Sequence, residues 1–548
     1  MTKKSFVRGA AILAIAGLAN RVVGAVSRIV LPALIGDEGM GLFQMAYPIY
    51  SIFLVVSTAG VPVAVSKLVA EQAAKGNSHG ARRILRVAAT ILFLTGAIGT
   101  LILVASADVL SSAVLRDRRA ALPIIATAPA VLILSFMSAF RGYFQGLQEM
   151  ERSANSQIAE QLIRVFSMIS LAYFLLPKGI DFSAAGASFG AVLGGIAGLI
   201  VILIPYYRQS SGSDKRGANS NLGLRGGQGD SVDPLSEGYM VSSAAIAGRI
   251  FSLSIPIVIG ASIMPLMQVV DAVLIPMRLN AAGVVGTQVT RLYGQLTGMA
   301  LPLVYFPTVI TTALAASAVP AVSEALAYKD RRMLISRSQD VIWFGALIGL
   351  PSSLGLFLLA DEFCAMFYRL PAAGVSLRAV AFGTLFLCLQ QTSSGVLQGL
   401  GEVTVPVRNL FVGAILKAIV NYVFTGIPAI GIKGAAWGTV IGFAISSILN
   451  LLYLSRKLGL ALDIQKHLIK PLIATCVMGI AVTLTYRLAH DALGSNTLAT
   501  LSATAIGAAI YGLLLLVTGA ISSRDIALLP MGAKISKILV KLGLIRDL

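Results

Sequence analysis

Residues 143–150 read YFQGLQEM, and residues 396–403 read VLQGLGEV. The two stretches share the Gln-Gly-Leu sequence at the same place. A basic residue follows each of them at the same distance, Arg164 in the first half of the chain and Lys417 in the second. This correspondence indicates that the chain contains one structural unit twice.

Two further matches follow the same order along the chain. The stretch GASFGAVLG from Gly186 corresponds to GAAWGTVIG from Gly434, with glycines at matching four-residue steps, and VPVAVSKL from Val61 resembles VPAVSEAL from Val319. Small residues at this spacing let helices pack closely in a membrane. We therefore expect two six-helix repeats in parallel topology. This arrangement is typical of transporters, although a purely structural duplicated bundle is the alternative.

The composition is that of a membrane protein. Of 548 residues, 56% are hydrophobic and 12% are charged, whereas about a quarter of a soluble chain is charged. Because one crossing takes about 20 apolar residues, we predict an all-α polytopic membrane protein with about fourteen transmembrane helices, forming two pseudo-symmetric six-helix lobes plus two C-terminal helices. The expected spans are 9–35, 42–70, 87–107, 120–141, 156–177, 183–207, 246–276, 287–327, 339–360, 377–398, 407–428, 433–455, 470–489 and 498–518.

These spans predict four regions. Residues 1–207 form an N-lobe with spans 1–6, and residues 246–455 form a C-lobe with spans 7–12. Between them, residues 208–245 are rich in glycine, serine and charge and are expected to be a flexible cytoplasmic linker. Residues 456–548 hold spans 13 and 14 and a basic cytoplasmic tail.

The net charge is +19, and most of the basic residues behind it lie in loops. Basic residues gather mainly in alternate short loops, which predicts that both termini are cytoplasmic. The basic loop LRDRRA around Arg116 is an exception on the opposite side. Because the basic residues form no soluble patch, we expect no nucleic-acid partner.

Two arginines interrupt the first span, in the stretch NRVVGAVSRIVLPALIG. At 1.5 Å per residue, Arg21 lies roughly 20 Å beyond Arg8 and about 22 Å before Gly36, which is near mid-membrane. The seven-residue spacing places Arg28 on the same helix face. Since a mid-membrane arginine costs about 2.5–3.5 kcal/mol, we predict that both face an aqueous cavity or an anion. The alternative is an arginine satisfied by backbone carbonyls or by a carboxylate of another helix.

Five other intramembrane charges are candidates. Arg291, in the first part of the eighth span, and Lys417 are expected to bind substrate together with Arg21 and Arg28. Glu160 and Arg164 are four residues apart and can pair on one helix face, so a local salt bridge is as plausible as a substrate role. Asp271 is a candidate counter-ion or ion-coupling residue.

The excess of intramembrane cations favours a diphosphate or another polyanion as ligand, because guanidinium groups bind phosphate oxygens in pairs. The sequence contains no Walker A motif, no HExxH motif and no Cys/His cluster. We therefore expect no enzyme activity, cofactor or metal. The three cysteines Cys364, Cys388 and Cys476 are expected to be small core residues.

The N-terminal part resembles a known family. Residues 8–50, RGAAILAIAGLANRVVGAVSRIVLPALIGDEGMGLFQMAYPIY, and residues 60–76, GVPVAVSKLVAEQAAKG, resemble the stage V sporulation protein B family of polysaccharide exporters. This family shares a superfamily with the MurJ-type lipid II flippases and the multidrug and toxin exporters. The resemblance continues through the YFQGL and VLQGL repeats and covers nearly the whole chain.

The resemblance implies alternating access by two lobes and a lipid-linked cell-wall precursor as cargo. In flippases of this group, arginines on the first and eighth spans line a central cavity. Arg21 and Arg291 match these positions, and Arg28 matches a second first-span position with a one-residue shift. The second span, IYSIFLVVSTAG, carries no charge, so a further arginine expected there is absent, which leaves room for a different polyprenyl-linked glycan.

The resulting expectation is a flippase for an undecaprenyl-diphosphate-linked glycan in a bacterial cytoplasmic membrane. Its partners would be the lipid-linked glycan diphosphate, membrane lipids and a coupling cation, and the protein would be a monomer. A multidrug or cation antiporter on the same fold and a non-transporting scaffold for wall synthesis are the alternatives.

Overall fold

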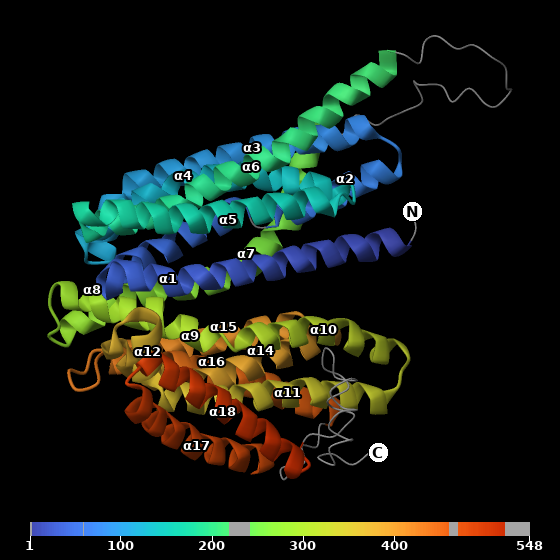
Figure 1. The fold of residues 1–548 in the computed structure, drawn as a ribbon. Coiled ribbons are helices and arrows are strands. Elements are labelled where there is room, and N and C mark those ends of the chain that lie inside the picture. Colours follow the sequence, from blue (N-terminus) through green and yellow to red (C-terminus); the bar gives the residue numbers. More distant parts are fainter. Residues whose placement is uncertain (1–2, 59, 219–241, 460–468, 521–548) are drawn as a thin grey trace. The chain divides into compact units, whose positions relative to one another are not determined.

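The structure is a computed structural model that describes residues 3–58, 60–218, 242–459 and 469–520. Its regular elements in these ranges are all helices (Figure 1). The expected all-α fold is therefore confirmed. Side chains are described from Ala16 onward, except those of residues 18, 19, 21 and 209–218.

The number of membrane spans agrees with the expectation once one break is considered. Twelve described helices are long and apolar enough to cross a membrane, or up to thirteen with the bent pair Pro371–Val380 and Gly383–Gly399. One of them, Val22–Ala74, has 53 residues, which is about 80 Å and more than twice a bilayer core. Helix α1 (Lys3–Thr58) is broken at Gly36 (φ 68°, ψ −172°). Counting the two parts of α1 as separate spans raises the number of candidate membrane spans from thirteen to fourteen.

The chain divides into two compact units. The N-terminal unit comprises Met1–Ile35 and Leu42–Ala272, and the C-terminal unit comprises Gly36–Gly41 and Val273–Leu548. The boundary thus lies inside helix α7 (Ser243–Ala281), later than the linker from which we expected the C-lobe to begin.

In the N-terminal unit, α4 packs against α2, α3 and α6, and α5 lies along α6 (Figure 1). Besides most of α1 and α7, the unit contains α2 (Val61–Ala74), α3 (Ser78–Val109), η1 (Leu110–Val114), η2 (Arg118–Ala120), α4 (Ala121–Gly146), α5 (Met150–Leu175), η3 (Leu176–Lys178) and α6 (Ile180–Ala218). Helix α6 continues into the first residues of the expected linker. Residues 219–241 of that linker lie outside the described residues.

In the C-terminal unit, α14 packs against α10, α11 and α16, and α15 lies along α16. The unit contains α8 (Thr287–Gly294), η4 (Gln295–Ala300), α9 (Leu301–Tyr305), α10 (Thr308–Ala327), α11 (Arg331–Leu358), α12 (Ala360–Tyr368), η5 (Pro371–Ala373), α13 (Gly374–Val380), α14 (Gly383–Gly399), α15 (Thr404–Phe424), α16 (Ile432–Leu458), α17 (Lys470–Leu493) and α18 (Asn496–Val517). The eighth expected span, residues 287–327, is interrupted between α8 and α10 by a π-helical turn and by Pro307.

The glycine steps explain how the repeat is built. A Cβ atom added to Gly194 of α6 would lie 2.7 Å from Cβ of Arg164 on α5. A Cβ atom added to Gly442 of α16 would lie 3.0 Å from Cβ of Lys417 on α15. Glycine is required because the helices of each pair approach so closely. The two pairs make the same contact at matching positions, which supports the duplication expected from the sequence.

Candidate functional site: a buried arginine–glutamate cluster

Three neighbouring helices of the N-terminal unit bring a polar cluster into an apolar bundle. Helix α4 supplies Arg141, and α5 supplies Ser156, Glu160 and Arg164. The four-residue steps on α5 place its three side chains along one helix face. Helix α6 contributes the backbone carbonyl of Gly198.

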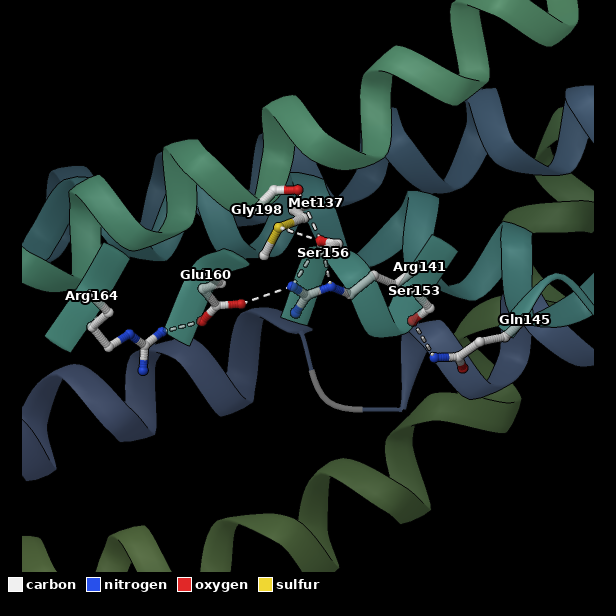
Figure 2. Close-up of polar contacts among 8 residues, drawn as sticks. All are labelled: Met137, Arg141, Gln145, Ser153, Ser156, Glu160, Arg164 and Gly198. Atoms are coloured by element: carbon white, nitrogen blue, oxygen red, sulfur yellow. Dashed lines mark hydrogen bonds and ion pairs between the residues drawn. The ribbon is translucent and has the colours of Figure 1, made fainter. Parts of the chain in front are cut away.

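Glu160 lies between the two arginines (Figure 2). Its Oε2 atom is 2.9 Å from an Nη atom of Arg141, and its Oε1 atom accepts a hydrogen bond from Arg164. The pairing of Glu160 and Arg164 expected from their spacing is therefore present. Arg141 was not expected in this cluster, because it reaches Glu160 from a different helix.

Arg141 is held in place by a second partner. Its Nε and Nη2 atoms donate to the hydroxyl oxygen of Ser156 at 3.2 and 2.9 Å. The Ser156 hydroxyl in turn donates to the carbonyl of Gly198 at 2.8 Å. The chain of contacts from α6 through Ser156 to Glu160 fixes the Arg141 guanidinium (Figure 2).

The cluster carries one more positive than negative charge. The exposed fractions of its side chains are 15% for Arg141, 12% for Glu160 and 21% for Arg164. Arg164 lies fourteen residues after the start of the 26-residue helix α5, roughly 21 Å along a helix of about 39 Å. Charges buried this deeply in a membrane helix mark functional sites more often than scaffolds.

Two buried donors beside Glu160 have no hydrogen-bond partner among the residues that the structure describes. One is the Nε atom of Arg164 and the other is the hydroxyl of Tyr50. Tyr50, on the second part of α1, is 3% exposed and lies near enough to Arg164 and Glu160 to interact with both electrostatically. A buried donor without an acceptor costs about 1–3 kcal/mol.

At the positions that match Arg141 and Ser156, the C-terminal unit carries uncharged residues. In the register of the repeat, Ser394 takes the position of Arg141 and Asn409 that of Ser156. The Asn409 amide donates to Asn450 at 2.9 Å, and the Asn450 amide lies 3.1 and 3.2 Å from the hydroxyls of Ser393 and Ser394. The duplication has thus kept the helices, their polar contacts and a buried cation, with Lys417 at the position of Arg164, but the counterparts of Arg141 and Glu160 are uncharged.

The first-span arginines remain predictions. The side chain of Arg21 lies outside those that the structure describes. Arg28 is exposed on α1, among the exposed apolar side chains of Val22, Val26 and Val30. Within the described ranges, no carboxylate forms an ion pair with Arg28.

Arg291 has a carboxylate partner that the sequence did not suggest. Its Nε and Nη2 atoms donate to Oε2 of Glu38 at 3.1 and 2.9 Å, and one helical turn later the Gln295 amide donates to Asp37 at 2.8 Å. Residues 36–41, which follow the break in α1, therefore bind to α8 and η4 within the C-terminal unit. The Arg291 side chain is still 47% exposed.

Glycines bring the backbones of these two segments together. A Cβ atom on Gly41 would lie 2.1 Å from the carbonyl oxygen of Thr290, and one on Gly294 would lie 2.0 Å from the carbonyl oxygen of Asp37. No other residue type fits at either position in this arrangement.

Lys417 and Asp271 are both buried. Lys417 packs against α16 at Gly442, and Asp271 lies on α7 at the end of the N-terminal unit. Each has an interaction partner. Their expected roles in substrate binding and ion coupling stay predictions.

Residues 6–326 match the family model described as polysaccharide biosynthesis protein. The chain belongs to this family. A second model, MatE, matches residues 296–423. With twelve or more described helices that are long and apolar enough to cross a membrane, this family member is a multi-pass membrane protein.

Two relatives of this family member in Bacillus subtilis span nearly its full length. Stage V sporulation protein B is 30% identical over 97% of this chain and 99% of that protein. The lipid II flippase MurJ is 26% identical over 92% of this chain and 94% of that protein.

Solved structures share the fold of this family member. A lipid II flippase MurJ in an inward closed conformation has a TM-score of 0.66 at 14% identity, covering 92% of this chain and 97% of the other. An inward-facing multidrug resistance MATE family transporter of the MOP superfamily has a TM-score of 0.60 at 15% identity, covering 80% and 94%.

Proposed function

We propose that the protein is a flippase or exporter for an undecaprenyl-diphosphate-linked glycan precursor of the cell wall, lipid II or a related lipid-linked oligosaccharide. It would act by alternating access in a bacterial cytoplasmic membrane, with both termini in the cytoplasm. Family membership and the full-length similarity to stage V sporulation protein B and MurJ support this proposal.

The observation that carries the proposal is the exposed guanidinium of Arg28. It lies eight residues before the break at Gly36, about 12 Å along an apolar helix. A charge at such a position is costly unless it meets water or an anion. A diphosphate supplies oxygens that match the guanidinium fork.

In the proposed mechanism the diphosphate head group enters from the cytoplasmic side and is held by Arg21 and Arg28. Arg291 and Lys417 are further candidates for this role. The protein then exposes the head group to the outer side while the lipid tail stays in the membrane. Membrane potential, an ion gradient or substrate supply could each bias such a two-state cycle, and Asp271 is the residue to test for cation coupling.

The experiment is transport of a lipid-linked diphosphate precursor in reconstituted vesicles. Arg21→Ala and Arg28→Ala should each abolish transport while the protein still inserts and folds, and Arg28→Lys should restore part of it because it keeps the charge. Normal transport by both alanine variants would remove the site assignment. Depletion in cells, followed by measurement of precursor on the outer leaflet, separates a transporter from a scaffold.

The MatE match over residues 296–423 favours a drug or cation antiporter as the second candidate. Such a protein needs a cavity carboxylate that can take up a proton or a cationic drug. Glu160 already has two arginine partners, so a cationic ligand would have to compete with both. Uptake of cationic dyes that does not depend on the lipid-linked precursor would favour this candidate.

A further inference from the structure

The arrangement around Glu160 is asymmetric. One carboxylate is shared by two guanidinium groups, and these are held differently. Arg141 is fixed by Glu160 and by Ser156, whereas the hydrogen bonds of Arg164 to other side chains in the described part all go to Glu160. Arg164 can therefore leave Glu160 while Arg141 continues to neutralise that carboxylate.

Arg164 and Tyr50 each have a buried hydrogen-bond donor without an acceptor in the described part of the chain. Both the Arg164 Nε atom and the Tyr50 hydroxyl are buried donors that find no acceptor within the described ranges. A water molecule could accept one hydrogen bond from each. The surplus positive charge of the cluster favours an anion, because hydrogen bonds between charged partners are about twice as strong as neutral ones.

We infer that Arg164 and Tyr50 form an oxyanion subsite in the N-terminal unit that takes a phosphate oxygen. Arg141 acts as the positioning residue that keeps Glu160 neutralised when Arg164 turns to the ligand. The inference rests on the proposed function, since the oxyanion would be the diphosphate of the lipid-linked cargo. It assigns a contact on α5 in addition to those expected on the first and eighth spans.

The position of Lys417 distinguishes this subsite from its repeat counterpart. Lys417 matches Arg164, but Gly413 stands where Glu160 is in the N-terminal unit. The C-terminal unit therefore has no carboxylate at the position of Glu160. The subsite belongs to one half of the duplicated fold.

The test uses the purified full-length protein in detergent and inorganic pyrophosphate as the probe, with binding measured by isothermal titration calorimetry. Arg164→Gln should weaken binding about tenfold or more, as expected for the loss of charge-assisted hydrogen bonds. Glu160→Gln should tighten binding several-fold, because it removes the carboxylate that competes for Arg164. General damage to the bundle would weaken binding in both variants, so the opposite signs identify the exchange.

The matched control is Arg337→Gln, which removes an arginine from a different Arg–Glu pair, that with Glu324, and should bind pyrophosphate like the parent protein. If Arg164→Gln does not fold, Tyr50→Phe decides, since it removes one hydroxyl without changing charge and should weaken binding about threefold or more. Parent protein that does not bind pyrophosphate, or unchanged affinity in Arg164→Gln or in Tyr50→Phe, overturns the subsite.

The two proposals fail in different ways. Pyrophosphate binding that depends on Arg164, together with vesicles that move no lipid-linked diphosphate, would end the proposed function and keep the subsite. Transport of the lipid-linked precursor with pyrophosphate affinity indifferent to Arg164 would end the subsite and keep the function.

Discussion

At the scale of single residues, the sequence predicts the ion pair of Glu160 and Arg164, and the structure adds Arg141. These three residues form a charged triad. The four-residue step from Glu160 to Arg164 is visible in the sequence, because it lies on one helix. Arg141 could be seen as a charge at the end of a predicted span, but its contact with Glu160 depends on how α4 packs against α5. The same holds for Glu38 and Arg291, which lie far apart in the chain and pair across a helix break. Local spacing predicts contacts within a helix, and only packing gives those between helices.

The triad predicts an unequal response to substitution. Arg141→Ala should destabilise the protein by about 1–3 kcal/mol, because Glu160 loses a buried charge partner but keeps Arg164. The measurement is thermal unfolding in detergent, and Arg337→Ala, at a more exposed pair, is the control. The double variant Arg141→Ala/Glu160→Ala should lose less stability than the two single variants added together. Equal stability of Arg141→Ala and the parent protein would show that the pair contributes nothing.

At the scale of helices, glycines decide where elements meet and where they break. The steps in α6 and α16 were visible in the sequence as close-packing signals, and each glycine does face the partner helix. The division of α1 at Gly36 was expected from length, since one helix cannot fill two spans. The placement of the unit boundary inside α7 could not be predicted, because it depends on which helices each part of α7 contacts.

These contacts make glycine substitutions position-dependent. Gly194→Ala should lower the unfolding temperature, because the new methyl group would lie 2.6 Å from the carbonyl oxygen of Glu160. The control is Gly355→Ala on α11, where an added Cβ meets nothing within 4 Å. That control should be neutral or more stable by up to about 1 kcal/mol, since alanine is the better helix former. Similar unfolding temperatures for the two variants would contradict the close approach of α5 and α6.

At the scale of the molecule, the duplication of one helical unit explains the fold. Different residues at equivalent positions of the two copies explain why the arginine–glutamate cluster lies in only one of them. Matching octapeptides, glycine steps and basic residues predicted the two copies, and the structure gives both copies the same contact between their fifth and sixth helices. The chemistry could not be predicted in the same way. A charged cluster in one unit and an amide–hydroxyl network in the other arise from a few substitutions at equivalent positions. Repeats therefore predict architecture better than they predict ligands.

The positive-inside pattern predicts the topology of the whole chain. In a variant without its three native cysteines, Ser495→Cys, between α17 and α18, should react with a membrane-impermeant maleimide added to intact spheroplasts. Ser78→Cys, after the basic loop that follows α2, should react only after the membrane is permeabilised. The reverse labelling pattern would invert the proposed orientation and the direction of transport.

The backbones of residues 36–41 and α8 approach so closely at Gly41 and Gly294 that one added methyl group would force the two segments apart. The new methyl carbon of Gly294→Ala would lie 2.0 Å from the carbonyl oxygen of Asp37, which is too close. We therefore expect this variant to shift toward conformers in which residues 36–41 have separated from α8. Disulfide trapping between Glu38→Cys and Arg291→Cys should fall in the Gly294→Ala background and persist with Gly355→Ala. Formation of this disulfide would then report, without any ligand, whether residues 36–41 stay on α8.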